Sequence, residues 1–245
     1  MKQSLFTMEH ARQLTADTYE LVLSGDTSAI TAPGQFVNIQ LPGKFPRRPI
    51  SICNWTKDAL LLLVRVVGEG THDLVRCVPG TELDGLSGIG NGFDLAKGGA
   101  HPILLGGGIG IAPLYGLAQR MLEAGIAPTV GLGFRSGGDA FYLEEFGKLG
   151  CRLMVATEDG SLGTKGFVTD LARHVPECGY AFVCGPTPML KAVHGLPQLT
   201  GGQFSFEARM GCGFGGCLGC SVPTGNGYKR VCKDGPILYK EEIVW

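Results

Sequence analysis

Four cysteines near the C-terminal end have the residue type and spacing most suited to chemistry. Cys212, Cys217 and Cys220 follow C-x4-C-x2-C, and Cys232 stands further along. This is the ligand spacing of a plant-type [2Fe–2S] loop. Glycine permits sharp turns and brings backbone N–H groups close to cluster sulfurs, and the loop contains Gly213, Gly215, Gly216 and Gly219. Such a cluster moves single electrons, so the pattern predicts an electron-transfer protein.

Zinc binding and disulfide formation are the two other uses of such cysteines. Structural zinc also takes four cysteines, but usually as two closely spaced pairs, whereas here three crowd together and the fourth is remote. Disulfides are less expected, because a reducing cytosol keeps thiols free and residues 1–20 lack the apolar stretch of a signal peptide. The remaining cysteines are scattered and are expected to be small buried residues: Cys53, Cys77, Cys151, Cys178 and Cys184.

Composition limits the function classes. The chain has 245 residues, 44% of them hydrophobic, and a net charge of −1, which allows one large or two modest domains and an appendage. The charge gives no electrostatic case for nucleic acid or an anionic membrane surface. No apolar run approaches the roughly 20 residues of a membrane span. We therefore expect a cytoplasmic protein that binds neither nucleic acid nor membrane.

The pattern of elements predicts an α+β multidomain chain in three parts. Residues 1–98 contain short alternating strands separated by turns, with one helix over 71–78, and predict an antiparallel β-barrel. Residues 99–205 alternate strands and helices, which predicts an α/β domain with a parallel sheet. Residues 206–245 are the third part, the cluster-binding segment. From about residue 204 onward, regular structure is expected to give way to the cysteine loop.

Glycine-rich turns and an arginine indicate where phosphates could bind. Gly108-Ile-Gly-Ile-Ala-Pro113 follows one predicted strand and opens a helix, so backbone N–H groups would face a pyrophosphate. The proline suits the first helical turn. Arg48 with Ser51, three residues on, could hold a diphosphate and a ribityl chain. The segment 67–71 is a further candidate anion site.

Three motifs in this order resemble the ferredoxin–NADP reductase superfamily. They are Arg48-Pro-Ile-Ser51, Gly108 to Pro113, and Cys184-Gly-Pro-Thr-Pro-Met189. The C-terminal E-x-x-M-x-C-G-x-G-x-C-x-x-C narrows the resemblance to the electron-transfer subunits of NAD-dependent type B dihydroorotate dehydrogenases. It covers essentially the whole chain. Many superfamily flavin motifs carry an aromatic residue where Ile50 stands, and that difference is read as a feature of the narrower family.

The resemblance implies FAD, a [2Fe–2S] cluster and NAD as cofactors. It places FAD contacts at Arg48, Pro49, Ile50, Ser51, Leu63, Val64, Arg65, Gly70 and Thr71. It places the dinucleotide at Gly108, Gly110, Pro113, Cys184 and Gly185, and the cluster on Cys212, Cys217, Cys220 and Cys232. The pattern itself leaves NAD and NADP open, since the second strand of the nucleotide domain ends in Arg135 with no acidic residue at its tip.

The implied function is an electron relay in pyrimidine (UMP) biosynthesis. By resemblance, dihydroorotate is oxidised at FMN in a separate catalytic subunit, with two copies of each subunit, and electrons pass through this chain to NAD+. No catalytic acid or base is named, because none of the five histidines lies in a triad-like setting. The alternatives are a flavin subunit of a related oxidoreductase (sulfide dehydrogenase, ferredoxin:NADP oxidoreductase, hydrogenase or sulfite reductase type) and a zinc-stabilised or redox-sensing module without turnover.

Overall fold

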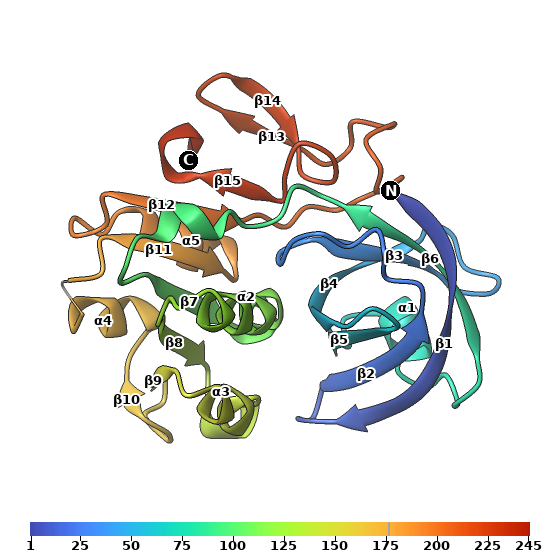
Figure 1. Cartoon of the computed structure of the whole chain (residues 1–245), viewed down its shortest axis with the longest axis horizontal. Helices are drawn as coiled ribbons and strands as arrows, with labels where there is room; N and C mark the ends of the chain where they lie inside the picture. The colour runs from blue at the N-terminus through green and yellow to red at the C-terminus, as the bar shows by residue number, and fades with distance from the viewer. Residues whose placement is uncertain (176) are drawn as a thin grey trace.

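The computed structural model describes residues 1–175 and 177–245 and begins with a closed six-stranded barrel (Figure 1). Neighbouring strands are antiparallel and follow the order β1-β2-β5-β4-β3-β6. The bounds are β1 Lys2–Gln13, β2 Thr18–Gly25, β3 Phe36–Gln40, β4 Arg48–Trp55, β5 Ala59–Arg65 and β6 Glu82–Ile89. Alternate residues fill the interior, as expected of strands with one buried face. The predicted barrel is confirmed.

One helix belongs to this part of the chain. α1 spans Glu69–Leu74 and contributes Leu74 to the barrel core. The sequence predicts this helix over 71–78, so the observed helix begins two residues earlier and ends four residues earlier than predicted. Val75 is already the cap, and Pro79 follows too closely for the helix to continue.

A seven-stranded sheet follows, in the order β10-β9-β8-β7-β11-β12-β15. All pairs are parallel except β12 with β15. The strands are β7 Ile103–Gly107, β8 Thr129–Phe134, β9 Arg152–Thr157, β10 Thr164–Lys165, β11 Tyr180–Cys184, β12 Gly201–Ser205 and β15 Ile237–Tyr239. The short 3₁₀ segment η1, Leu95–Gly98, leads into the sheet from the barrel. The sheet confirms the predicted α/β architecture.

Helices cover both faces of this sheet. Side chains from α2 (Ala112–Glu123) and α3 (Leu143–Leu149) share one apolar core with Leu104 of β7. Side chains from α4 (Val168–Arg173) and α5 (Thr187–His194) share a second core with the adjacent Leu105. Because successive residues of a strand point to opposite faces, the two cores lie on opposite sides of the sheet. None of the helices in the described ranges is long and apolar enough to span a membrane.

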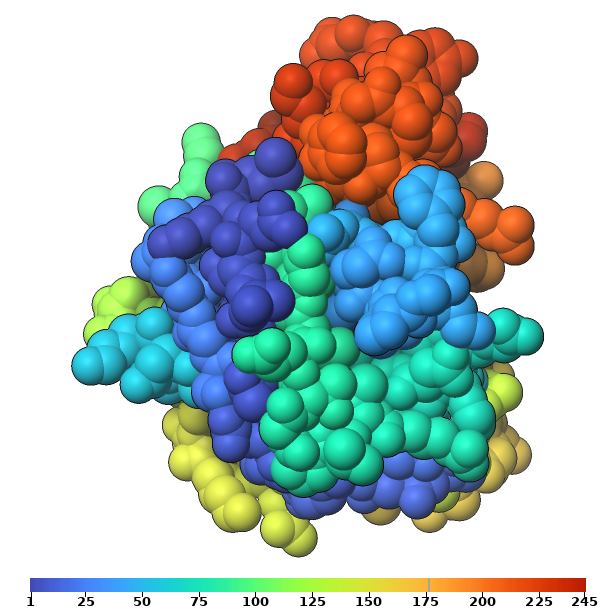
Figure 2. Space-filling view, turned by 90° about the vertical axis from the view of Figure 1, so that its right-hand side faces the viewer, coloured from blue at the N-terminus to red at the C-terminus, as the bar shows by residue number. Residues whose placement is uncertain are grey.

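The C-terminal segment lies on one end of the barrel and also completes the sheet (Figure 2). It contains the hairpin β13 (Ser221–Thr224) and β14 (Gly227–Arg230), then β15 and the 3₁₀ turn η4, Lys240–Glu242. The expectation that regular structure ends near 204 is wrong beyond the cysteine loop, because these strands are too short to show periodicity. The boundaries 98/99 and 205/206 stay predictions, and β15 lies past the second one yet pairs with β12.

The barrel and the sheet pack through α2. Gly116 of α2 lies against the Cys53 carbonyl of β4, where a Cβ would have no room. Asn54 Nδ2 donates to Gln119 Oε1 at 2.8 Å. Arg120 lies 3.5 Å from the centre of the Trp55 ring and donates to Asn54 Oδ1 at 2.9 Å. Apolar packing, hydrogen bonds and a cation–π contact therefore hold the two parts together.

Candidate cofactor and cluster sites

Two cavities meet at the carboxyl ends of β7 and β11. One has a volume of about 540 Å³ and the other about 420 Å³. From β7 the chain continues to β8 on one side of it, whereas β11 pairs with β7 on the other side. The strand order therefore reverses at β7, and open α/β sheets bind ligands at such a switch point. The cavities share a wall formed by Arg65, Gly107, Gly108, Ile109 and Pro186.

The smaller cavity lies between the barrel and the sheet and is called here the barrel-side cavity. Most of the predicted FAD residues line it: Pro49, Ile50, Ser51, Leu63, Val64, Arg65 and Thr71. Four predicted dinucleotide residues line it from the sheet: Gly108, Gly110, Cys184 and Gly185. Burial raises the pKa of the Cys184 thiol to about 12, so this cysteine remains a neutral wall residue rather than a nucleophile.

Three predicted site residues do not line either cavity: Arg48, Gly70 and Pro113. Arg48 instead donates to the Pro46 carbonyl and packs across Gly70, where a Cβ would clash with its guanidinium. Pro113 is buried in the first turn of α2. Arg48 adjoins Pro49, which does line the barrel-side cavity, so the structure places it next to the predicted site rather than in it.

The glycine turn forms the shared wall through close backbone packing. Gly108 begins the 3₁₀ turn η2, Gly108–Ile111, with φ +54°, a left-handed conformation that glycine adopts most readily. Gly110 lies against β11, and a Cβ there would stand 2.6 Å from the Cys184 carbonyl carbon and 2.7 Å from the Gly185 nitrogen. The strand–turn–helix context predicted for this motif is confirmed.

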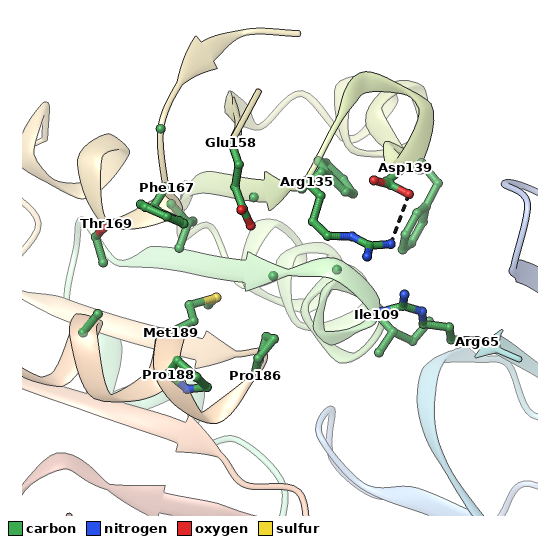
Figure 3. Close-up of a pocket in the computed structure, with 18 of the residues that line it drawn as sticks. Arg65, Ile109, Arg135, Asp139, Glu158, Phe167, Thr169, Pro186, Pro188 and Met189 are labelled. Atoms are coloured by element: carbon green, nitrogen blue, oxygen red, sulfur yellow. Dashed lines mark ion pairs between the residues drawn. The ribbon is translucent and has the colours of Figure 1, made fainter. Parts of the chain in front are cut away.

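The larger cavity opens beyond this wall and is called here the nucleotide cavity (Figure 3). Arg135, Asp139 and Glu158 line one end of it, and Figure 3 shows Arg135 directed toward Asp139, with 3.6 Å between Nη2 and Oδ1. Met189 lines the other side and packs over Gly107 and Gly185. The sequence prediction missed Asp139, which lies five residues past the end of β8, and Glu158, which directly follows the neighbouring strand β9.

The four predicted ligand cysteines lie as two pairs. Cys220 Sγ and Cys232 Sγ are 3.3 Å apart and buried. Cys212 and Cys217 are close enough for their thiols to interact, and Cys217 is exposed. In residues 1–175 and 177–245, no three His, Cys, Asp or Glu side chains converge on one point suited to a single metal ion. Two sulfur pairs fit two irons better than one zinc, because each iron of a [2Fe–2S] cluster takes two protein ligands.

Backbone N–H groups already stabilise negative charge on one of these sulfurs. Gly216 N donates to Cys212 Sγ at 3.2 Å, and Cys217 N does so at 3.4 Å. Burial alone would raise the pKa of Cys212, but N–H groups including that of Phe214 lower it to about 6. Burial, with the neighbouring Cys220 thiol, raises the pKa of Cys232 to about 12. The loop thus favours a thiolate at its outer end, as a metal-binding sulfur requires.

The cysteine loop is attached to the barrel at two points. Asn38 Nδ2 of β3 donates to the Cys212 carbonyl at 3.1 Å. Gly213, at φ +75°, passes so close to the Asn38 amide that any Cβ would clash. Phe36, also on β3, packs in the same apolar cluster as Cys220 and Cys232 and also lines the barrel-side cavity. Phe36 therefore belongs to the apolar cluster of the buried sulfur pair and also borders that cavity.

Comparison with known proteins agrees with this arrangement. A family model described as "Iron-sulfur cluster binding domain of dihydroorotate dehydrogenase B" matches residues 207–244, and "Oxidoreductase NAD-binding domain" matches residues 104–195. The chain is 40% identical to "Dihydroorotate dehydrogenase B (NAD(+)), electron transfer subunit" of Shouchella clausii (strain KSM-K16), covering 99% of this chain and 98% of that one. The Bacillus cereus (strain Q1) protein of the same name matches with the same identity and coverage.

The chain belongs to the family of dihydroorotate dehydrogenase B electron transfer subunits. The predicted membership is confirmed. A member of this family is the electron-transferring component of an NAD+-linked oxidoreductase, and here residues 207–244 form its iron–sulfur cluster-binding domain.

Solved structures share the fold. The structure titled "Insights into flavin-based electron bifurcation via the NADH-dependent reduced ferredoxin-NADP oxidoreductase structure" matches with a TM-score of 0.89 and 29% identity, over 98% of this chain and 90% of that one. A ferredoxin NADP+ reductase from Neisseria gonorrhoeae with bound FAD and NADP matches with a TM-score of 0.67 and 14% identity, over 79% of this chain and 89% of that one. The second likeness shows the barrel-and-sheet fold alone.

Proposed function

We propose that this subunit carries electrons from an FMN-containing, dihydroorotate-oxidising partner to NAD+, using a [2Fe–2S] cluster and FAD. The observation that carries the proposal is the order of the sites. The buried sulfur pair Cys220 and Cys232 adjoins the barrel-side cavity through Phe36, and that cavity adjoins the nucleotide cavity through the Gly107–Ile109 wall. A flavin exchanges electrons singly or in pairs, which a one-electron cluster and a two-electron nicotinamide both require.

The barrel-side cavity suits FAD. Its floor is apolar, from Ile50, Leu63 and Val64, which suits a flat ring system. Ser51 and Thr71 bring hydroxyls, and Arg65 a guanidinium, which suit the ribityl and phosphate oxygens. The residues present therefore fit the group that the sequence motif predicts.

The nucleotide cavity suits NAD rather than NADP. At one end of this cavity Arg135 is the cation that could accept a 2′-phosphate, but Asp139 already pairs with it. Glu158 adds a second carboxylate at the same end of the cavity (Figure 3). Two carboxylates against one guanidinium disfavour a phosphate dianion and leave acceptors for a ribose 2′-hydroxyl.

The cysteine loop suits docking of the catalytic partner. Phe214 is 49% exposed and Leu218 is 62% exposed, and both lie between ligand cysteines. Exposed apolar side chains that gather beside a redox centre indicate a protein interaction surface, whereas isolated exposed ones do not.

The proposed assembly holds two copies of each subunit. In the residues that the structure describes, none of the nine cysteines forms a disulfide, which suits a cytoplasmic location in reducing conditions.

A flavin subunit of a different oxidoreductase is less supported. The ferredoxin:NADP type of structure shares the fold at 29% identity, against 40% for the dihydroorotate dehydrogenase B subunits over almost the whole chain.

The proposal is tested by reducing the isolated subunit with NADH under anaerobic conditions. Purified protein should contain FAD, two irons and two acid-labile sulfides per chain, as a [2Fe–2S] cluster requires. NADH should bleach the flavin absorbance and produce the EPR signal of a reduced [2Fe–2S] cluster. Stoichiometric zinc without sulfide would contradict the cluster, and a bleached flavin without any EPR signal would contradict the connection between them.

A further inference from the structure

A carboxylate of the barrel is bonded from across the boundary with the sheet. Glu20 of β2 is buried, with 8% of its surface exposed. Arg12 of β1 holds both of its oxygens, from Nε and Nη2, at 3.0 Å each. The Tyr142 hydroxyl, from the other side of the boundary, donates to Glu20 Oε2 at 2.6 Å. Arg12 Nη2 also lies 3.4 Å from Glu145 Oε1 on α3, so both parts of the molecule share one charged network.

Tyr142 adopts an unusual backbone conformation to make this contact. Its φ is +64°, in the left-handed region, at the residue just before α3. A residue other than glycine persists there only where its surroundings fix it. The ring is buried and packs edge-on against Tyr115, with 5.2 Å between the two ring centres. Tyr115 in turn packs edge-on against Phe146 of α3. Because Tyr142 is not helical, α3 begins only at Leu143.

The bond joins the two segments that face each other across the nucleotide cavity. Asp139 and Phe141 line that cavity and lie within three residues of Tyr142. Asp17 and Thr18 line it from the barrel and lie within three residues of Glu20. The segment 135–141 and the start of β2 are thus tied together immediately behind the cavity wall. Neither Tyr142 nor Glu20 lines the cavity itself.

We infer that Tyr142 is a positioning residue for the nicotinamide dinucleotide: its hydroxyl bond to Glu20 holds segment 135–141 at a fixed distance from β2. The inference rests on the proposed placement of NAD in this cavity. A tyrosine and a carboxylate form a short, charge-assisted bond that resists opening in a buried setting. The pocket is held in its binding shape before the ligand arrives, which lowers the cost of binding.

The test compares Tyr142→Phe with Tyr115→Phe in the complete, cofactor-loaded subunit. The first variant removes the hydroxyl that bonds Glu20 and keeps the ring. The control removes a hydroxyl from the same aromatic cluster and leaves the Glu20 bond in place. Tyr142→Phe should weaken NADH binding about tenfold and raise the KM for NADH, with FAD content and kcat near wild type. Tyr115→Phe should bind NADH as wild type does.

Hydrogen–deuterium exchange without nucleotide gives a second, independent readout. Exchange in residues 135–141 should rise in Tyr142→Phe and stay unchanged in Tyr115→Phe. Unchanged exchange there overturns the positioning role, whatever happens to NADH binding. A Tyr142→Phe variant that melts at a lower temperature but binds NADH with wild-type affinity also overturns it. Failure of the wild-type subunit to bind NADH would instead contradict the proposed function.

Discussion

Gly110→Ala introduces one methyl group at the wall between the two cavities. The new Cβ would stand 2.6 Å from the Cys184 carbonyl carbon and 2.7 Å from the Gly185 nitrogen. Both are backbone atoms of β11 and the turn after it, so neither can rotate away as a flexible side chain would. The η2 turn and β11 must therefore separate, which distorts the wall that both cavities share.

Overpacking of this kind costs about 1–3 kcal/mol. If that cost falls on the bound geometry, the affinities for FAD and NADH drop about 5- to 150-fold. The affinity for FAD is measured by the flavin that the protein retains after gel filtration. The affinity for NADH is measured on the protein reconstituted with excess FAD. Iron and sulfide content should remain at wild-type levels, because the three heavy atoms nearest to the new methyl group all belong to Cys184 and Gly185, and none belongs to the cysteine loop.

Gly147→Ala is the matched control. Gly147 is an exposed residue of α3, and a Cβ there would meet no heavy atom within 4 Å outside its own helix and chain neighbours. Alanine is favoured over glycine in a helix by up to about 1 kcal/mol, so this variant should be as stable as wild type or more so, with unchanged cofactor binding. Wild-type FAD and NADH affinities in Gly110→Ala would refute the role assigned to the backbone contact.

Two further predictions concern charged residues. Arg48 lies beside the barrel-side cavity and not in its lining, but the sequence motif predicts that it contacts the FAD diphosphate. If so, Arg48→Ala should weaken FAD retention by about one to two decades, the worth of one charge-assisted contact, and leave the cluster spectrum intact; unchanged flavin content after dilution would remove Arg48 from the binding set. Wild type should prefer NADH, Arg135→Ala should change the NADH rate little, and Glu158→Gln should improve the kcat/KM for NADPH on the order of tenfold; a large NADH defect in Arg135→Ala, or NADPH preference in wild type, would contradict the charge argument.

The sequence predicted those structural features that are determined by residues close together in the chain. The cysteine spacing, the Gly108–Pro113 turn and the alternation of barrel strands each follow from conformational preferences within a few positions. The structure places most of the motif-based FAD residues around one cavity. Arg48 and Gly70 lie beside it, because a motif specifies the strand and leaves each side chain's direction open.

The rest depends on contacts between distant segments. Phe36 adjoins Cys220 and Cys232 only because the C-terminal segment folds back on β3. Glu158 and Asp139 meet at one cavity because β8 and β9 are adjacent in the sheet. Nothing local in the sequence signals the Tyr142 bond to Glu20, which joins residues 122 positions apart. The short strand β15 lacks any periodicity and is fixed by its pairing with β12.

The most direct measurement is NAD+ reduction by dihydroorotate with and without the catalytic partner. The isolated subunit should transfer electrons from NADH to artificial acceptors but should not oxidise dihydroorotate, and addition of the FMN-containing partner should start dihydroorotate-linked NAD+ reduction. Cys220→Ser should keep the reaction with artificial acceptors and lose the coupled one, because only the coupled reaction needs the cluster. Coupling at full rate in Cys220→Ser, or dihydroorotate oxidation by the isolated subunit, would contradict the proposed relay.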